Sequence, residues 1–237
     1  MILVRRGHPP KDLERLRQKG IKKGWTPKRA YSELKNPLKT LVRQQLVDEQ
    51  GGLCAYCMCK IPRNDVSTNM ADKAITIEHY IPRDPLDGRD VGQGLDYNNF
   101  LAVCHGNQAP HGICKEKDLT CDAHRRNIEF KKVNPCNPST LKSIFYHLDG
   151  RIDASDSDVK FDLTDTLNLN CPNAPQLGER KAALDALIFD IGKQNGDTIQ
   201  TYCVQVLNMF QLETNPKTPY VGILIWYLQT IIDSFNT

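Results

Sequence analysis

The sequence lacks a hydrophobic run long enough to cross a membrane. Its longest apolar stretch, VGILIWYL at 221–228, continues into the polar Gln229, whereas a membrane helix needs about 20 apolar residues. It also lacks a secretory signal peptide, because MILVRRGHPP turns polar after four residues. These absences predict a soluble protein of the cytoplasm.

Internal repeats and long low-complexity tracts are also missing. At 40% hydrophobic and 25% charged residues, the composition is that of an ordinary globular protein. A length of 237 residues is enough for one large domain or two small ones with a buried core.

The net charge of +3 is small but unevenly distributed. Residues 1–50 contain 13 Lys/Arg and 5 Asp/Glu, whereas residues 137–237 contain 7 and 12. A basic N-terminal arm suits contact with a phosphate backbone. The alternative is a basic helix face that is simply solvated.

Eight of the nine cysteines lie between residues 54 and 171. Without a secretion signal, such clustering favours metal binding in a reducing compartment over disulfides. Cys54-Ala-Tyr-Cys57 has the spacing of a zinc knuckle, and the βαβ context of a redox motif is absent. The candidates for the remaining ligands are Cys104, Cys114 and Cys121, with His105 and His111 as weaker ones.

The pattern of apolar residues predicts helices in the N-terminal and C-terminal parts of the chain. Residues 53–132 have only short strand-like pieces, which suits a small domain organised around metal. A strand pair is expected at 141–153, turning at Asp149-Gly150. The predicted helices are 11–23, 37–50, 178–192, 197–213 and 218–235.

The stretch ITIEHYIP (75–82) places a carboxylate and an imidazole side by side at the end of a short strand. It is either a surface turn or half of a metal site. Downstream come YNNFLAVC (97–104) and TCDAHRRN (120–127). In this order, the motifs Ile77-Glu78-His79-Tyr80-Ile81-Pro82 and Asn99-Phe100-Leu101-Ala102-Val103-Cys104 resemble those of HNH endonucleases, the ββα-metal family.

The resemblance implies an α+β fold with a zinc-stabilised ββα-metal core and an active site built on these motifs. His79 would be the general base, and Glu78 would bind catalytic Mg²⁺ or Mn²⁺. Since successive strand residues point to opposite faces, the chain must bend here for both to serve one site. Asn99 would hold the His79 ring, with Asn98 as its rival.

The same resemblance assigns roles within TCDAHRRN. His124 would complete the catalytic metal site, and Asp122 is the alternative carboxylate ligand. Arg125 and Arg126 would contact the scissile strand of the nucleic acid, or else be solvated helix charges. Structural Zn²⁺ would be bound by Cys54, Cys57, Cys104 and Cys121; if Cys114 were the true ligand, this third motif would shift in register.

A wider set of motifs resembles one subgroup of the family. RRGHPP, QQLVDEQGGLCAYC, and CDAHRRN followed by NP are similar to PtuB-like HNH proteins of Septu anti-phage systems and some retrons. This implies phage or plasmid DNA as the target, an SMC- or ABC-like ATPase (PtuA-like) as partner, and in retrons a reverse transcriptase with its msDNA. The alternatives are an RNA- or tRNA-cleaving effector and a non-catalytic, zinc-containing DNA-binding module.

We therefore divide the sequence into three parts. Residues 1–50 would form a basic helical arm, residues 51–153 the HNH nuclease domain, and residues 154–237 a helical region for partner docking or dimerisation. A helical cap on the nuclease core is the alternative for this last part.

Overall fold

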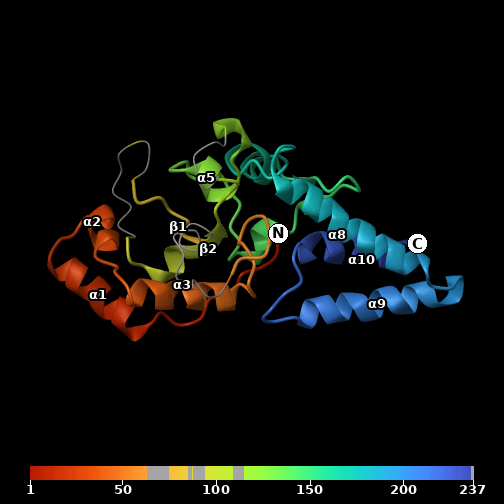
Figure 1. Ribbon diagram of the computed structural model, residues 1–237, viewed down its shortest axis with the longest axis horizontal. Coiled ribbons are helices and arrows are strands. Elements are labelled where there is room, and N and C mark those ends of the chain that lie inside the picture. Colours follow the sequence, from red (N-terminus) through yellow and green to blue (C-terminus); the bar gives the residue numbers. More distant parts are fainter. Residues whose placement is uncertain (63–74, 85–86, 88–93, 109–114, 236–237) are drawn as a thin grey trace.

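The computed structural model describes residues 1–62, 75–84, 87, 94–108 and 115–235. It is an α+β structure with two small antiparallel sheets, β1–β2 and β3–β4. Figure 1 shows α1 and α2 at one end of the molecule, α8, α9 and α10 at the other, and β1, β2, α3 and α5 between them. The helices are α1 (Lys11–Lys22), α2 (Pro27–Ser32), α3 (Leu38–Glu49), α5 (Cys121–Arg125), α6 (Pro138–Leu141), α7 (Ser157–Phe161), α8 (Pro175–Gly192), α9 (Gly196–Leu212) and α10 (Val221–Ser234). The strands are β1 (Ile75–His79), β2 (Phe100–Cys104), β3 (Ile144–Tyr146) and β4 (Ile152–Ala154), with single turns η1 (Tyr97–Asn99), η2 (Glu116–Asp118) and η3 (Asp162–Thr166).

The two helices predicted in the N-terminal arm are confirmed as α1 and α3. Acidic residues in the first turn of α1 and lysines in its last turn complement the helix dipole. The short helix α2 was not predicted. It begins where Thr26 accepts a hydrogen bond from the Arg29 amide at 3.3 Å, with Pro27 in the first helical turn.

The central sheet consists of two five-residue strands in antiparallel register. His79 pairs with Phe100, and Ile75 pairs with Cys104. The predicted strand thus ends at His79, and the chain bends at Tyr80 and Ile81. Every residue of β2 is buried, and in β1 only Thr76 is exposed.

The predicted strand pair is also confirmed, as β3 and β4. Its turn is closed by a hydrogen bond from the His147 amide to the Arg151 carbonyl at 2.9 Å, and Gly150 adopts a positive φ of 87°. The three predicted C-terminal helices are confirmed as α8, α9 and α10.

A single hydrophobic core runs through all three predicted parts of the chain. It includes Leu13 in α1, Phe100 in β2, Leu184 in α8 and Leu224 in α10. The C-terminal helices therefore share their interior with the central region. Within the described ranges, none of the helices combines the length and apolar character needed to cross a bilayer.

Candidate metal centre and active site

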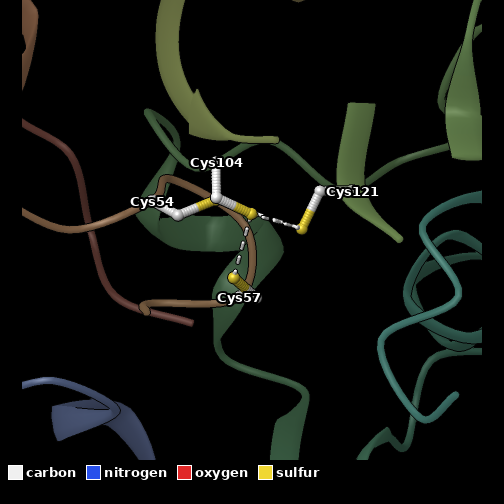
Figure 2. A group of neighbouring side chains, drawn as sticks. All are labelled: Cys54, Cys57, Cys104 and Cys121. Carbon is white, nitrogen blue, oxygen red and sulfur yellow. Dashed lines mark hydrogen bonds between the residues drawn. The ribbon is translucent and has the colours of Figure 1, made fainter. Parts of the chain in front are cut away.

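Four cysteine side chains from three separate parts of the chain meet in the interior. Cys54 and Cys57 come from the loop after α3, Cys104 ends β2, and Cys121 begins α5. Figure 2 shows the four side chains turned toward one another. All four are buried, and their sulfur atoms lie within 4.8 Å of one another.

The sulfur spacing fits a tetrahedral zinc site. The Sγ–Sγ distances are 3.7 Å for Cys57–Cys104, 3.8 Å for Cys104–Cys121 and 4.0 Å for Cys54–Cys121. Zn–S bonds of about 2.3 Å at tetrahedral angles place sulfur atoms about 3.8 Å apart. The hydrogen bond with Cys121 also lowers the pKa of the Cys104 thiol to about 6, which favours its thiolate form. These four buried cysteines can hold a structural zinc ion.

A tight loop places the first two thiols. Gly51 and Gly52 adopt positive φ values of 68° and 77° as α3 ends, and the chain then turns sharply inward. The amide of Cys54 donates to the Cys59 carbonyl at 2.9 Å, and the amide of Met58 donates to the Cys54 carbonyl at 3.1 Å. These bonds satisfy the backbone of the buried loop.

A close backbone approach joins the other two thiols across the long insertion between them. Gly106 has a φ of 60°, and a Cβ at this position would lie 2.2 Å from the Thr120 carbonyl oxygen. The Thr120 amide in turn donates to the Gly106 carbonyl at 3.0 Å. Since Thr120 immediately precedes Cys121, this contact brings the start of α5 back to the end of β2.

The other candidate zinc ligands do not join this cluster. Cys114 and His111 lie outside the described residues. His105 is described but is not part of the four-cysteine group. The remaining cysteines are reduced and also outside the group: Cys59, Cys136, Cys171 and Cys203.

A polar cavity of about 340 Å³ lies between β1 and α5. Glu78 and His79 line it from the strand, and Asp122 and Arg126 line it from the helix. Arg83 also contributes to its wall. Glu78 and His79 both line this cavity although they are adjacent in β1, and the chain bends only after them, at Tyr80 and Ile81.

Glu78 is a buried carboxylate held by several donors. Its Oε1 accepts from the Tyr56 hydroxyl at 3.2 Å and from the Arg125 guanidinium, and its Oε2 accepts from the His79 amide at 3.1 Å. Burial raises the pKa of Glu78 well above its usual range, and the neighbouring Asp122 carboxylate raises it further. Two neighbouring carboxylates, of which Glu78 is buried and Asp122 half-buried, form a site that a divalent cation would stabilise.

The His79 imidazole is buried between aromatic rings. The rings of Tyr31 and Phe100 meet it edge to face, with centroids 4.8 and 4.9 Å away. Its Nε2 lies 3.3 Å from the Gly94 carbonyl oxygen. Burial, followed by the charge of Arg83, lowers the pKa of His79 to about 3, so the ring is neutral at physiological pH.

Asn99 supports the segment after His79 rather than the imidazole itself. Its Oδ1 accepts from the Ile81 amide at 2.7 Å, and its Nδ2 donates to the Ile81 carbonyl at 2.9 Å. The predicted hold on the His79 ring is therefore indirect. Asn99 is buried, whereas its rival Asn98 is exposed.

The helix α5 turns Asp122, and not His124, toward the cavity. The His124 Nδ1 lies 3.1 Å from the Thr166 carbonyl oxygen, and His124 does not line the cavity. The physical reason is helical phase. At 100° per residue, position 124 lies about 200° around the helix from Asp122, so the two side chains leave nearly opposite sides of α5. Of the two residues predicted as metal ligands on α5, the cavity is lined by Asp122 and not by His124.

The two arginines of α5 differ in environment. Arg125 is fully buried, where it pairs with Glu78 and donates to the carbonyls of His79 and Tyr80 at 3.1 and 2.7 Å. The predicted nucleic-acid contact is wrong for Arg125, because burial and these bonds keep it from a ligand. Arg126 is exposed and pairs with Glu116 at 2.7 Å.

Sequence reasoning missed the supporting residues around this cavity. Tyr31 reaches His79 from α2, and Arg83 lies over the Tyr31 ring, 4.2 Å from its centroid. A Cβ on Gly94 would lie 2.2 Å from the Pro27 carbonyl oxygen, so α2 packs closely on the backbone that accepts from His79. No sequence pattern marks these long-range contacts.

A scan against protein-family models gave no match, and a search of curated proteins found no similar sequence. Any functional proposal therefore depends on the residues of the chain and their arrangement.

Proposed function

We propose that this protein is a metal-dependent HNH-type endonuclease that hydrolyses phosphodiester bonds of DNA. The observation that carries the proposal is the shared cavity of Glu78, His79 and Asp122. These side chains come from β1 and α5, and α5 also carries Cys121 of the four-cysteine cluster. The chain order β1, β2, α5 is that of a ββα-metal core.

The catalytic cation would be held by Glu78 and Asp122. Mg²⁺ and Mn²⁺ favour carboxylate oxygens and often use one or two of them, with waters filling the other positions. Glu78 fits because its two oxygens retain acceptor capacity beyond the three donors that they now have. When bound, the cation supplies a positive charge that stabilises the leaving oxygen.

His79 would accept the proton of the attacking water. With Nε2–H donating to the Gly94 carbonyl, Nδ1 carries the lone pair that a general base needs. Asn99 holds the backbone that follows the base, and the Tyr31 and Phe100 rings fix the plane of the imidazole. A bound phosphate would add the negative charge that favours the protonated ring during reaction.

The cationic side chains on the cavity wall would bind the phosphate. Arg126 and Arg83 both line the cavity, and a guanidinium can form paired hydrogen bonds with phosphate oxygens. Arg126 can exchange its exposed partner Glu116 for phosphate at little cost, since exposed ion pairs are weak. The basic helix α1 would extend this electrostatic attraction along a longer nucleic acid.

The N-terminal motifs carry the more specific part of the proposal. Through their resemblance to PtuB-like proteins, they support an effector of an anti-phage defence system that acts with an SMC- or ABC-like ATPase. RNA, including tRNA, is the alternative substrate, because the site acts on the phosphodiester and does not read the base.

Cleavage assays on supercoiled DNA and on RNA, with Mg²⁺ or Mn²⁺, test the proposal. We expect His79→Ala to lower DNA cleavage by about 10²–10⁴-fold, the usual contribution of a general base. The matched control is His124→Ala, a histidine on α5 that does not line the cavity and should retain near-normal activity. Full activity of His79→Ala would refute the mechanism. Cleavage of RNA but not of DNA would show that RNA, and not DNA, is the substrate.

A further inference from the structure

Arg180 in α8 is a fully buried guanidinium without an acidic partner. It has 0% exposure, and none of the ion pairs among the described residues includes it. Its Nε donates to the Gly150 carbonyl, and its Nη2 donates to the Leu169 carbonyl at 3.1 Å and to the Asn170 Oδ1 at 3.2 Å. These acceptors are all neutral, and its Nη1 has no hydrogen-bond partner within the described part of the chain. Burying a charge in this way is costly unless an opposite charge lies nearby.

The groups that act on Arg180 electrostatically include two members of the four-cysteine cluster. They are Cys57 and Cys121, together with Tyr146 and Tyr220. Burial raises the pKa of Tyr146 and of Tyr220 further above the ordinary tyrosine value, so both hydroxyls are uncharged. Cys57 and Cys121, as zinc-bound thiolates, would supply negative charge to Arg180.

The backbone also connects Arg180 to the cluster. The Cys121 amide donates to the Leu167 carbonyl at 2.8 Å, two residues before the Leu169 carbonyl that Arg180 holds. On the other side of the cluster, the Tyr220 amide donates to the carbonyl of Met58, which follows Cys57, at 3.0 Å. The C-terminal part of the chain therefore contacts the segments that carry the cysteines at two points.

We propose that Arg180 is the counter-charge of the four-cysteine zinc centre. Four thiolates around one divalent ion leave two negative charges uncompensated. In a buried site this excess is unfavourable, and a guanidinium fixed nearby offsets it. Zinc binding in turn supplies the anion that Arg180 lacks, so the metal and the C-terminal helices stabilise each other. This inference concerns the zinc centre and does not depend on the proposed nuclease activity.

Zinc affinity tests the proposal, measured on the full-length protein by competition with a chromophoric chelator at constant pH. We expect Arg180→Met to weaken zinc binding by about 10- to 100-fold, as is usual when a supporting group around a metal site is removed. Arg180→Lys keeps the charge and should restore most of the affinity. By linkage, Arg180→Met should also destabilise the zinc-bound protein more than the zinc-free protein.

The matched control is Asn170→Ala. It removes a hydrogen-bond acceptor of Arg180 and the two bonds that Asn170 makes with Ile152, without changing any charge. We expect it to lower the unfolding free energy and leave zinc affinity unchanged. An Arg180→Met protein with normal zinc affinity, or an equal loss of affinity in Asn170→Ala, would overturn the proposal in favour of a purely hydrogen-bonding role.

A second variant covers the case in which Arg180→Met does not fold. Cys57→His lowers the negative charge of the centre while keeping four ligands. If Arg180 compensates that charge, Arg180→Met should be better tolerated in the Cys57→His background, with more soluble, zinc-containing protein than the single variant yields. Equal insolubility in both backgrounds would count against the proposal.

Discussion

At the scale of single residues, Arg125 shows how a surface-type residue becomes part of the interior. Its guanidinium joins Glu78 to the carbonyls of His79 and Tyr80, so it fixes the bend that turns the β1 motif into one site. The Phe130 ring covers it, with the guanidinium carbon 4.1 Å from the ring centroid.

Replacing Arg125 by Met should therefore be strongly destabilising. Removing one partner of a buried ion pair leaves the other charge unpaired, at a typical cost of about 3–5 kcal/mol. Urea denaturation measures this loss. Arg126→Met, next to it but in an exposed pair, should change stability by less than about 1 kcal/mol. Similar values for the two variants would contradict the structural role of Arg125.

His79 should make stability depend on pH. Its folded-state pKa of about 3 lies below the ordinary value of 6.5, so the unfolded chain binds the proton more readily. The contribution of neutral His79 is complete above pH 6.5 and is lost as the pH falls toward 3. Denaturation of wild type and His79→Gln across this window isolates the effect, because all other groups are shared. If the unfolding free energies of the two proteins changed with pH in parallel, a contribution of His79 would be excluded.

At the scale of elements, the start of α5 depends on one glycine. Gly106→Ala would force a Cβ against the Thr120 carbonyl and place alanine at a φ of 60°. The unfavourable backbone conformation of alanine alone should lower the free energy of unfolding by about 1–3 kcal/mol. Because the contact positions Cys121 beside Cys104, zinc content should fall as well.

Gly178→Ala is the control for that variant. Gly178 lies within α8, and a Cβ there would meet no atom within 4 Å. The substitution should stabilise the protein by about 0.5–1 kcal/mol through helix propensity. Thermal denaturation and zinc analysis compare the two. Retained zinc in Gly106→Ala would show that α5 is positioned by other contacts.

At the scale of the whole molecule, the continuous core predicts that zinc removal affects both ends of the chain. Metal binding and folding are coupled when the ligands come from distant segments. We expect Cys54→Ser, or a strong chelator, to lower the unfolding midpoint of the entire protein, with Cys136→Ser, outside the cluster, close to wild type. The two tryptophans, Trp25 and Trp226, report on the N-terminal and C-terminal parts. A fluorescence change at only one of the two tryptophans would indicate that the N-terminal and C-terminal parts unfold as separate domains.

The elements with strong local signals could be predicted from the sequence alone. Apolar spacing and helix-ending glycines predicted α1, α3, α8, α9 and α10, and Asp149-Gly150 predicted the β3–β4 turn. The spacing of Cys54 and Cys57 predicted the first pair of zinc ligands, and the resemblance to HNH proteins added Cys104 and Cys121, which the structure brings together with them. These features are encoded by residues close in the chain, or by ligand types that few other arrangements could satisfy.

Tertiary packing, in contrast, sets which side chains face the cavity and which are buried as structural support. Whether Asp122 or His124 faces the cavity depends on the phase of α5, which its packing against β2 and η3 sets. The burial of Arg125 and Arg180, and the approach of Tyr31 to His79, join segments far apart in sequence. Such contacts arise from the packing of a shared core, so no local pattern of residues predicts them.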